Sequence, residues 1–311
     1  MAAGHAIVPQ RSKFGDAPRG LMEMTMMRQR RPLRLRRLTA LALPLALACA
    51  PAGAAKAPAP PPGPPPTYAD LVGLAEAAPV VAELTVKSQA TVPPERAPGL
   101  AADHVRLYLE TQTLRVLKGP SALGESVHYL ADVPVDAKGK PPKLRKQTFL
   151  VFAKPVPGRP GELQLVGRDA QLPLDPATEA RVRAVITQLV APDVQPRVTG
   201  VHDVISVAGN LAGESETQMF VDTATGAPAS LTVVHRPNQQ PTWGVSWSEI
   251  VDQSAKPPER DTIAWYRLAC SLPRSLPRAA YLQSDAAGRN RAEADYSFIL
   301  DSLGPCERTL R

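Results

Sequence analysis

The sequence predicts an α+β fold, in which a small five-stranded β-barrel is followed by an antiparallel four-stranded meander with packed helices. Two observations support this. Strand-like segments recur five times between residues 80 and 167, and four more follow at short spacing between residues 201 and 251. Helical patterns with recognisable caps flank both groups. Since 311 residues suffice for two cores, we predict one domain over 67–193 and another over 198–311.

The predicted barrel region begins with a helix that is followed at once by a strand. Thr67-Tyr-Ala-Asp70 has the pattern of a capped helix start, and we expect the helix to end near Ala78, before Pro79. In the strand, apolar side chains alternate with polar ones, as in a sheet with one face in water. The apolar positions are Val80, Ala82, Leu84 and Val86, and the polar ones are Glu83, Thr85 and Lys87.

A second, longer strand is predicted from His104 to Leu117. Its apolar residues change parity partway along, so we expect the buried face to switch sides around Glu110–Thr113. A strand can do this only through a bulge or a sharp bend. The first face carries Val105, Leu107 and Leu109, and the second carries Leu114 and Val116.

Three more strands and a helix complete this region. Asp175 is the expected N-cap of the helix, Pro176 stands at its first position, and the helix ends before Pro192. Five strands, one strongly bent, with a helix at each end are typical of a barrel of the oligonucleotide/oligosaccharide-binding (OB) type. The strands are expected at Ser126–Asp132, Gln147–Lys154 and Glu162–Gly167, and the apolar helix stripe is Val182, Val185, Ile186 and Leu189.

Two short motifs in this region resemble a known family. Val-Leu-Lys-Gly (Val116–Gly119) closes the long strand, and Phe-Leu-Val-Phe (Phe149–Phe152) lies in a later one. With them, the region resembles the exported netrin-like, or tissue-inhibitor-of-metalloproteinase-like, barrels of bacteria, which implies a fold but no mechanism. In the animal inhibitors an N-terminal cysteine ligates the zinc of the target. Residues 67–193 contain no cysteine, so the resemblance does not imply metalloprotease inhibition here.

The predicted second domain is a four-stranded meander followed by helices. Asp261 is the expected N-cap of the first helix, Thr262–Cys270, and Gly304 closes the last one, Arg291–Leu303. The first helix is apolar nearly all round, so we expect it to lie buried between the sheet and the last helix. The strands are expected at 201–208, 217–222, 230–235 and 242–251, and a short helix at 278–283.

Cys270 and Cys306 stand at the ends of two of these helices. Once the leader described below is removed they are the only cysteines left, and two cysteines in an exported chain are usually paired. We therefore predict a disulfide between them. The alternatives are two buried thiols, or a redox pair, although the spacing is not the Cys-x-x-Cys of redox enzymes.

Residues 1–54 have the order of a secretory signal. A basic segment, Arg28–Arg37, precedes an apolar run, Leu38–Ala48, and a small-residue cleavage triplet, Ala52–Ala54. The apolar run is shorter than the roughly 20 residues that span a bilayer. We therefore expect a cleaved signal peptide and export to the periplasm or cell envelope.

Two features near this signal bear on how the exported chain is held. Lipidation of Cys49 would tether it to a membrane, although Ala46-Leu-Ala48 departs from the usual lipoprotein pattern. Residues 55–66 form a proline-rich linker, either a semi-rigid stalk or a leader left after cleavage. Met26 or Met27 fits the start of the signal better than Met1 does.

The net charge of +7 is concentrated in the leader, which has nine basic and two acidic side chains and leaves 27 of each sign elsewhere. This distribution argues against a nucleic-acid partner. Outside the leader, cations gather only in the loop 136–146, which has no interleaved aromatic residue on which bases could stack. The alternatives are a contact for lipid phosphates or another polyanion, and a solvated hairpin tip. The cations are Lys138, Lys140, Lys143, Arg145 and Lys146.

Trp243 and Trp247 lie on one face of the last predicted strand, together with Val245. Two tryptophans in a row are a candidate stacking platform for an envelope glycan. The alternative is that this face is core and packs against the helix that bears Trp265.

The sequence shows no catalytic constellation, cofactor motif or metal-ligand spacing, and Gly213-Glu-Ser-Glu-Thr217 lacks the second glycine of a nucleophile elbow. We therefore predict an exported, envelope-associated binding protein without cofactor or metal, whose partner is an unknown envelope protein or glycan. The alternative is an exported envelope hydrolase with its site in the second domain, near Glu214, Ser215, Glu216, Asp222 or His235.

Overall fold

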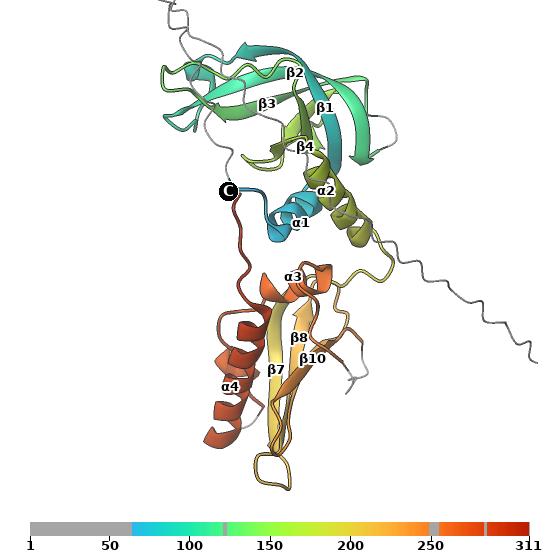
Figure 1. Ribbon diagram of the computed structural model, residues 1–311, viewed down its shortest axis with the longest axis vertical. Coiled ribbons are helices and arrows are strands. Elements are labelled where there is room, and N and C mark those ends of the chain that lie inside the picture. The colour runs from blue at the N-terminus through green and yellow to red at the C-terminus, as the bar shows by residue number, and fades with distance from the viewer. Residues whose placement is uncertain (1–63, 121–122, 249–254, 283–284, 311) are drawn as a thin grey trace, which may run out of the picture. The chain divides into compact units, whose positions relative to one another are not determined.

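A computed structural model describes residues 64–120, 123–248, 255–282 and 285–310 (Figure 1). The predicted leader with Cys49 and all but the last three residues of the proline-rich linker lie outside the described residues. No helix in the described ranges is long and apolar enough to cross a membrane.

The first sheet is a closed five-stranded barrel, as predicted. Its strands follow one another in the order β1-β2-β3-β5-β4, and β4 pairs with β1 to close the ring. Only β3 and β5 run parallel, which makes the barrel mixed and consistent with an OB-like barrel. The strands are β1 (Val80–Thr91), β2 (His104–Lys118), β3 (Ser126–Pro134), β4 (Thr148–Pro155) and β5 (Glu162–Leu165), and a short β6 (Gln171–Pro173), not predicted, pairs with β4.

The predicted irregularity in β2 is present, but its effect on burial is not the one expected. The register between β1 and β2 shifts at Lys87, opposite Glu110 and Thr111 and so within the predicted segment, again at Leu114 just after that segment, and a third time between Val81 and Ala82. Leu107 and Leu109 are buried in the barrel, whereas Leu114 is 54% exposed. The prediction that Leu114 is buried was therefore wrong, because Leu114 is the extra, unpaired residue of a bulge and its side chain remains in solvent.

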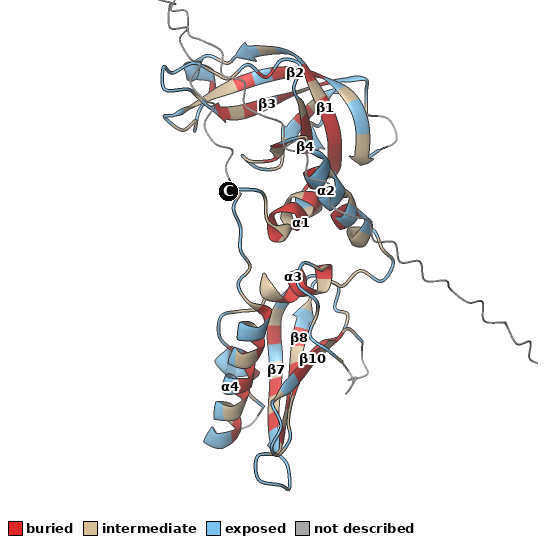
Figure 2. Cartoon of the chain, viewed as in Figure 1, coloured by how far each residue is buried: buried red, intermediate tan, exposed pale blue. Residues whose placement is uncertain are grey.

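The first half of β1 is buried on both faces, which also differs from the prediction (Figure 2). The inward side chains belong to the barrel core, and the outward Val81 packs in a second cluster with residues of the helices α1 (Tyr68–Ala77) and α2 (Pro176–Leu189). Glu83, expected in water, is buried as well. Only the end of the strand, from Lys87, has an exposed outward face.

Both of these helices begin where the capping pattern predicts. Thr67 Oγ1 accepts a hydrogen bond from the amide of Asp70, and the carboxylate of Asp70 accepts one from the amide of Thr67, which makes a capping box. Asp175 caps α2 through the amides of Ala177 and Thr178. A short 3₁₀ helix, η1 (Pro94–Arg96), lies between β1 and β2.

The second sheet is the predicted antiparallel meander, in the order β10-β9-β8-β7. Its helices start elsewhere than expected. Thr262, not Asp261, caps α3, and α4 begins five residues earlier than predicted, after Asp285. The elements are β7 (Val198–Ala208), β8 (Ser215–Thr223), β9 (Ala229–His235), β10 (Thr242–Ser246), α3 (Ile263–Ala269), the 3₁₀ helix η2 (Arg278–Ala280) and α4 (Ala286–Leu303).

The last helix, α4, lies along β7 and β8 (Figure 1). The expectation that α3 is buried between the sheet and α4 needs correction, because α3 contacts α1 and α2 as well as α4. The ring of Trp265 meets that of Tyr68 edge to face, and the buried Arg267 forms an ion pair with Glu76 of α1. One hydrophobic cluster thus runs from α1 and α2 to the second sheet. The division into domains at 193–198 stays a prediction.

The close approach of another segment requires a glycine at position 244 in β10. A Cβ added to Gly244 would meet the carbonyl oxygen of Ala255, a backbone atom that cannot rotate away. We expect Gly244→Ala to lower the free energy of unfolding by about 1–3 kcal/mol, measured by urea denaturation. Gly167→Ala is the matched control, since a Cβ there meets nothing within 4 Å, and a loss as large in the control would contradict the explanation.

Candidate functional site

A cavity of about 870 Å³ opens on the outer face of the barrel. Its floor is formed by the outward side chains of β2 and β3 and by β5. Its rim comes from the loop between β1 and β2, which contains η1, and from the loop between β4 and β5. Strands 2 and 3 with these two loops are the surface through which OB barrels bind oligonucleotides and oligosaccharides. We call this surface the barrel face.

Strand alternation determines which side chains lie on the barrel face. Leu109 and Tyr129 point into the core, so Tyr108, His128 and Leu130 point outward. The rings of Tyr108 and His128 stack with their centroids 5.6 Å apart and an angle of 9° between their planes. Tyr108 is 40% and Leu130 46% exposed, so a ring surface and an aliphatic surface lie next to each other in solvent. Such a surface can stack a sugar ring or another flat ligand group.

Four arginines give the barrel face its polar character. Arg106 donates two hydrogen bonds to Asp132, at 2.6 and 2.8 Å, and these hold the pKa of Asp132 below its usual range. Arg159 pairs with Glu162 across 3.2 Å. Arg96 and Arg168 also line the cavity, and both are exposed without an ion-pair partner among the described residues. These two guanidinium groups can bind carboxylate or phosphate groups of a ligand.

The second sheet carries part of the predicted hydrolase site. Glu214, Ser215 and His235 line one cavity of about 470 Å³ beside α4. The other two candidates lie apart from it, Glu216 bonded to Gln218 and Asp222 bonded to His202. No hydrogen bond in the described residues joins the hydroxyl of Ser215 to His235, whose Nε2 instead lies 2.6 Å from Asp295. The structure therefore brings three of the five together without the nucleophile–base contact that a serine hydrolase needs.

Trp243, the first tryptophan of the proposed platform, is only 4% exposed, and its indole donates to the hydroxyl of Ser302 at 2.8 Å. Trp247 is partly buried and packs against the same cluster, which also contains Trp265. The core alternative is thus confirmed for Trp243, because a buried ring offers no face to a glycan.

The basic loop between β3 and β4 presents all five predicted cations to solvent, namely Lys138, Lys140, Lys143, Arg145 and Lys146. The loop backbone is held against β1, since Gln89 donates to the carbonyl of Pro142 and accepts from the amide of Leu144. The carboxylate of Asp136 accepts from two amides of the loop. A fixed loop with outward cations fits both of the alternatives that the sequence left open.

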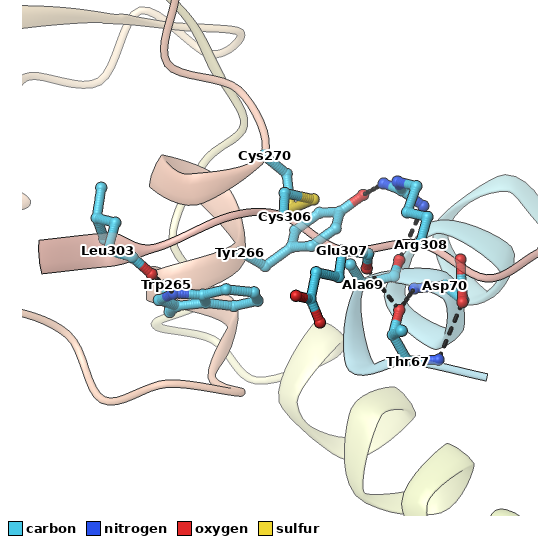
Figure 3. The surroundings of a disulfide bond; sticks show 10 residues. All are labelled: Thr67, Ala69, Asp70, Trp265, Tyr266, Cys270, Leu303, Cys306, Glu307 and Arg308. Atoms are coloured by element: carbon cyan, nitrogen blue, oxygen red, sulfur yellow. Dashed lines mark hydrogen bonds between the residues drawn. A yellow bond between two sulfur atoms is a disulfide. The ribbon is translucent and has the colours of Figure 1, made fainter. Parts of the chain in front are cut away.

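The predicted disulfide joins Cys270, at the end of α3, to Cys306, just beyond α4 (Figure 3). The segment that follows Cys306 returns to α1, where Arg308 donates to the carbonyl of Ala69 and to the hydroxyl of Tyr266. The bridge therefore has a structural role, since it anchors the segment that covers the start of α1.

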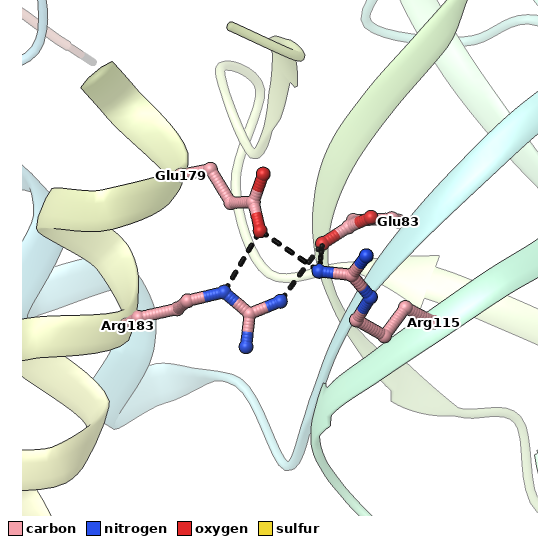
Figure 4. A network of polar contacts seen from close by, with 4 residues as sticks. All are labelled: Glu83, Arg115, Glu179 and Arg183. Carbon is pink, nitrogen blue, oxygen red and sulfur yellow. Dashed lines mark hydrogen bonds and ion pairs between the residues drawn. The ribbon is translucent and has the colours of Figure 1, made fainter. Parts of the chain in front are cut away.

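A cluster of two acids and two arginines, not foreseen from the sequence, joins α2 to the barrel (Figure 4). Glu179 of α2 contacts both Arg115 and Arg183, and the buried Glu83 of β1 contacts the same pair. Burial, and then the charge of Glu179, raises the pKa of Glu83. Because each charge has a partner of opposite sign in the cluster, we assign it to the docking of α2 and not to a ligand.

The described ranges contain no group of three or more His, Cys, Asp or Glu side chains that could hold a metal ion. Comparison with known protein families and with curated proteins finds no match to this chain. The fold and the barrel face together define a protein with a closed, OB-like barrel and an open cavity on the outer face of that barrel.

The sequence alone did not reveal the barrel face. Tyr108, His128 and Leu130 have no motif around them, and each looks like an ordinary strand residue. The usable signal was their parity, since all three alternate with the residues expected in the core. In the geometry of an OB barrel, these positions of the predicted second and third strands lie on the outer face of the barrel.

Proposed function

We propose that this chain is an exported, envelope-associated binding protein that binds an anionic glycan on its barrel face. The observation that carries the proposal is the open cavity in which the Tyr108–His128 ring stack lies among arginines, two of which, Arg96 and Arg168, lack an ion-pair partner among the described residues. Ring surface for stacking and guanidinium groups for carboxylates are the features with which proteins bind acidic sugars.

A glycan fits the barrel face better than a nucleic acid does. Asp132 and Glu162 pair with Arg106 and Arg159, which leaves Arg96 and Arg168 for a ligand. Two arginines suit separate carboxylates better than a continuous phosphate backbone, which needs a row of cations. Outside the leader the chain has equal numbers of basic and acidic side chains, so no excess of charge attracts a polyanion over a long range.

Export is supported by the order of the leader and by the disulfide, since such bridges persist in oxidising compartments. The strand order of the barrel is compatible with the netrin-like resemblance, which we extend to the fold of this region alone. An unknown envelope protein is the alternative partner, and the signal region or a lipidated Cys49 is the candidate membrane tether.

Retention of glycans tests the proposal. Immobilised residues 56–311, which contain every described element, are expected to retain acidic glycan fragments released from bacterial envelopes, measured by carbohydrate analysis. Tyr108→Ala and Arg168→Gln should each lower the affinity about tenfold, since each removes one direct contact. Arg181→Gln on α2, an exposed arginine away from the barrel face, is the matched control.

Two results would contradict the proposal in different ways. Retention that is equal in the unmodified chain and in both barrel-face variants would place the glycan elsewhere. Retention of a stoichiometric protein with no glycan would make that protein the partner.

The hydrolase remains the second candidate, because Glu214, Ser215 and His235 line one cavity. Turnover of muropeptides or simple esters by the unmodified chain, lost in His235→Gln, would favour it. Without a hydrogen bond between Ser215 and His235 we rank it below the binding protein.

A further inference from the structure

The cavity beside α4 contains polar groups from three parts of the fold. Arg291 and Asp295 are four residues apart on α4 and therefore lie on the same side of that helix. His235 comes from the end of β9, and the loop between β7 and β8 forms the opposite wall. Because the volume is about 470 Å³, the cavity has room for a small molecule.

Asp295 is the central group of this cavity wall. It is 3% exposed, and its Oδ1 lies 2.6 Å from Nε2 of His235. Its Oδ2 accepts a hydrogen bond from Thr217 at 2.5 Å. An ionised carboxylate can only accept, so Nε2 of the imidazole carries the proton. The ring therefore has Nδ1 as its other polar atom, and the side chain is 34% exposed.

Arg291 is held by hydrogen bonds that continue from Thr217 through Ser206. The hydroxyl of Thr217 lies 2.8 Å from that of Ser206, and Arg291 donates to the hydroxyl and carbonyl oxygens of Ser206 at 3.3 and 3.2 Å. These contacts engage Nε and one terminal nitrogen of the guanidinium. Among the described residues no carboxylate pairs with Arg291. These hydrogen bonds thus hold the guanidinium of Arg291 and the imidazole of His235 in fixed positions at the cavity wall. Both groups are cations when the imidazole is protonated.

A purely structural role would not require these groups. Buried ionic and hydroxyl groups lose solvation, and apolar residues of similar volume hold a helix on a sheet at least as well. Ionisable groups fixed by buried partners at a cavity wall are typical of binding and catalytic sites. Glu214 lines the same cavity, but two backbone amides of its own loop bond its Oε2 and offset part of its charge.

We propose that this cavity is a second binding site, for a small anion with a carboxylate or phosphate group, which is bound between Arg291 and His235. The ligand oxygens accept hydrogen bonds from the outer guanidinium nitrogen and from Nδ1 of the protonated imidazole. Asp295 orients the ring and compensates its charge. This site is separate from the barrel face and does not depend on the function proposed for it.

Nuclear magnetic resonance of the imidazole nitrogens tests the site directly. Residues 56–311 labelled with ¹⁵N at histidine are titrated with acetate in one experiment and inorganic phosphate in another. We expect the His235 resonances to shift saturably with at least one of the two anions. His202 is the internal control, because it forms an exposed pair with Asp222 on the same sheet, 3.0 Å apart, and lies outside the cavity. Arg291→Gln should weaken the binding about tenfold, and Arg181→Gln should leave it unchanged.

Each outcome of the titration either supports or contradicts the anion site beside α4. Saturation with phosphate but not acetate, or the reverse, identifies the anion. Equal shifts of His235 and His202, or no saturation up to tens of millimolar of either anion, would show that the network only holds α4 on the sheet. If Arg291→Gln loses its dispersed amide spectrum, the comparison of His235 with His202 in the unmodified chain still decides.

Discussion

Replacing both Cys270 and Cys306 by alanine is expected to lower the free energy of unfolding by about 4 kcal/mol. The two cysteines are 36 residues apart, and opening a loop of this length returns conformational entropy to the unfolded chain. The folded state should also lose order locally, because the segment after Cys306 makes the contacts to Ala69 and Tyr266. Urea denaturation at neutral pH measures the first effect, and amide exchange at Thr309 the second.

This experiment has one control and one outcome that would contradict the prediction. The unmodified chain in reductant should match the double variant, since both lack the bridge and keep everything else. A loss below about 1 kcal/mol would mean that the unfolded chain is already compact enough for the bridge to constrain it little.

The second large effect is expected at Asp70, a buried carboxylate in the first turn of α1. Its Oδ2 accepts from the amide of Thr67 and from the amide and hydroxyl of Thr309, at 2.9, 2.9 and 2.8 Å. Asp70→Ala removes the capping box and the attachment of the C-terminal segment together, so we expect a loss of about 3 kcal/mol. Asp175→Ala, which removes only a local helix cap, is the matched control and should cost about 1 kcal/mol.

The contribution of Asp70 to the free energy of unfolding should also depend on pH. Burial disfavours its charge, but the hydrogen bonds from Thr309 and Thr67 outweigh burial and hold the pKa below its usual value. A lowered pKa means that the stabilisation is fully present above the unfolded pKa of about 3.9 and is lost as the pH falls through the folded pKa. The difference in the free energy of unfolding between the unmodified chain and Asp70→Ala should therefore shrink below about pH 4. Urea denaturation at pH 7 and pH 3 measures it, and an equal difference at both would contradict the assignment.

Elements that depend on neighbouring residues could be predicted from the sequence. The cap of Thr67 on α1 and that of Asp175 on α2 are formed by residues at most three positions away, so the pattern contains the whole interaction. Alternation likewise located the strands of the barrel and of the meander. The pairing of Cys270 with Cys306 followed from the cysteine count, because these are the only two cysteines outside the predicted leader.

Burial of particular faces was less predictable, because it depends on which element covers them. Glu83 looked like a solvent position, and only the packing of α2 against β1 buries it. Leu114 looked like a core position, and only the register between β1 and β2 places it in a bulge. Trp243 had two possible roles until the burial of its ring decided between them.

The sequence by itself determined the fold class, the N-caps of α1 and α2, the disulfide and most strand positions, since each of these rests on local patterns or on composition. The tertiary structure alone decided the two candidate sites. Tyr108 and His128 are 20 residues apart, and His235 and Asp295 are 60 apart. Their contacts depend on strand register and on where α4 lies on the sheet, and no local preference of either residue encodes such long-range geometry.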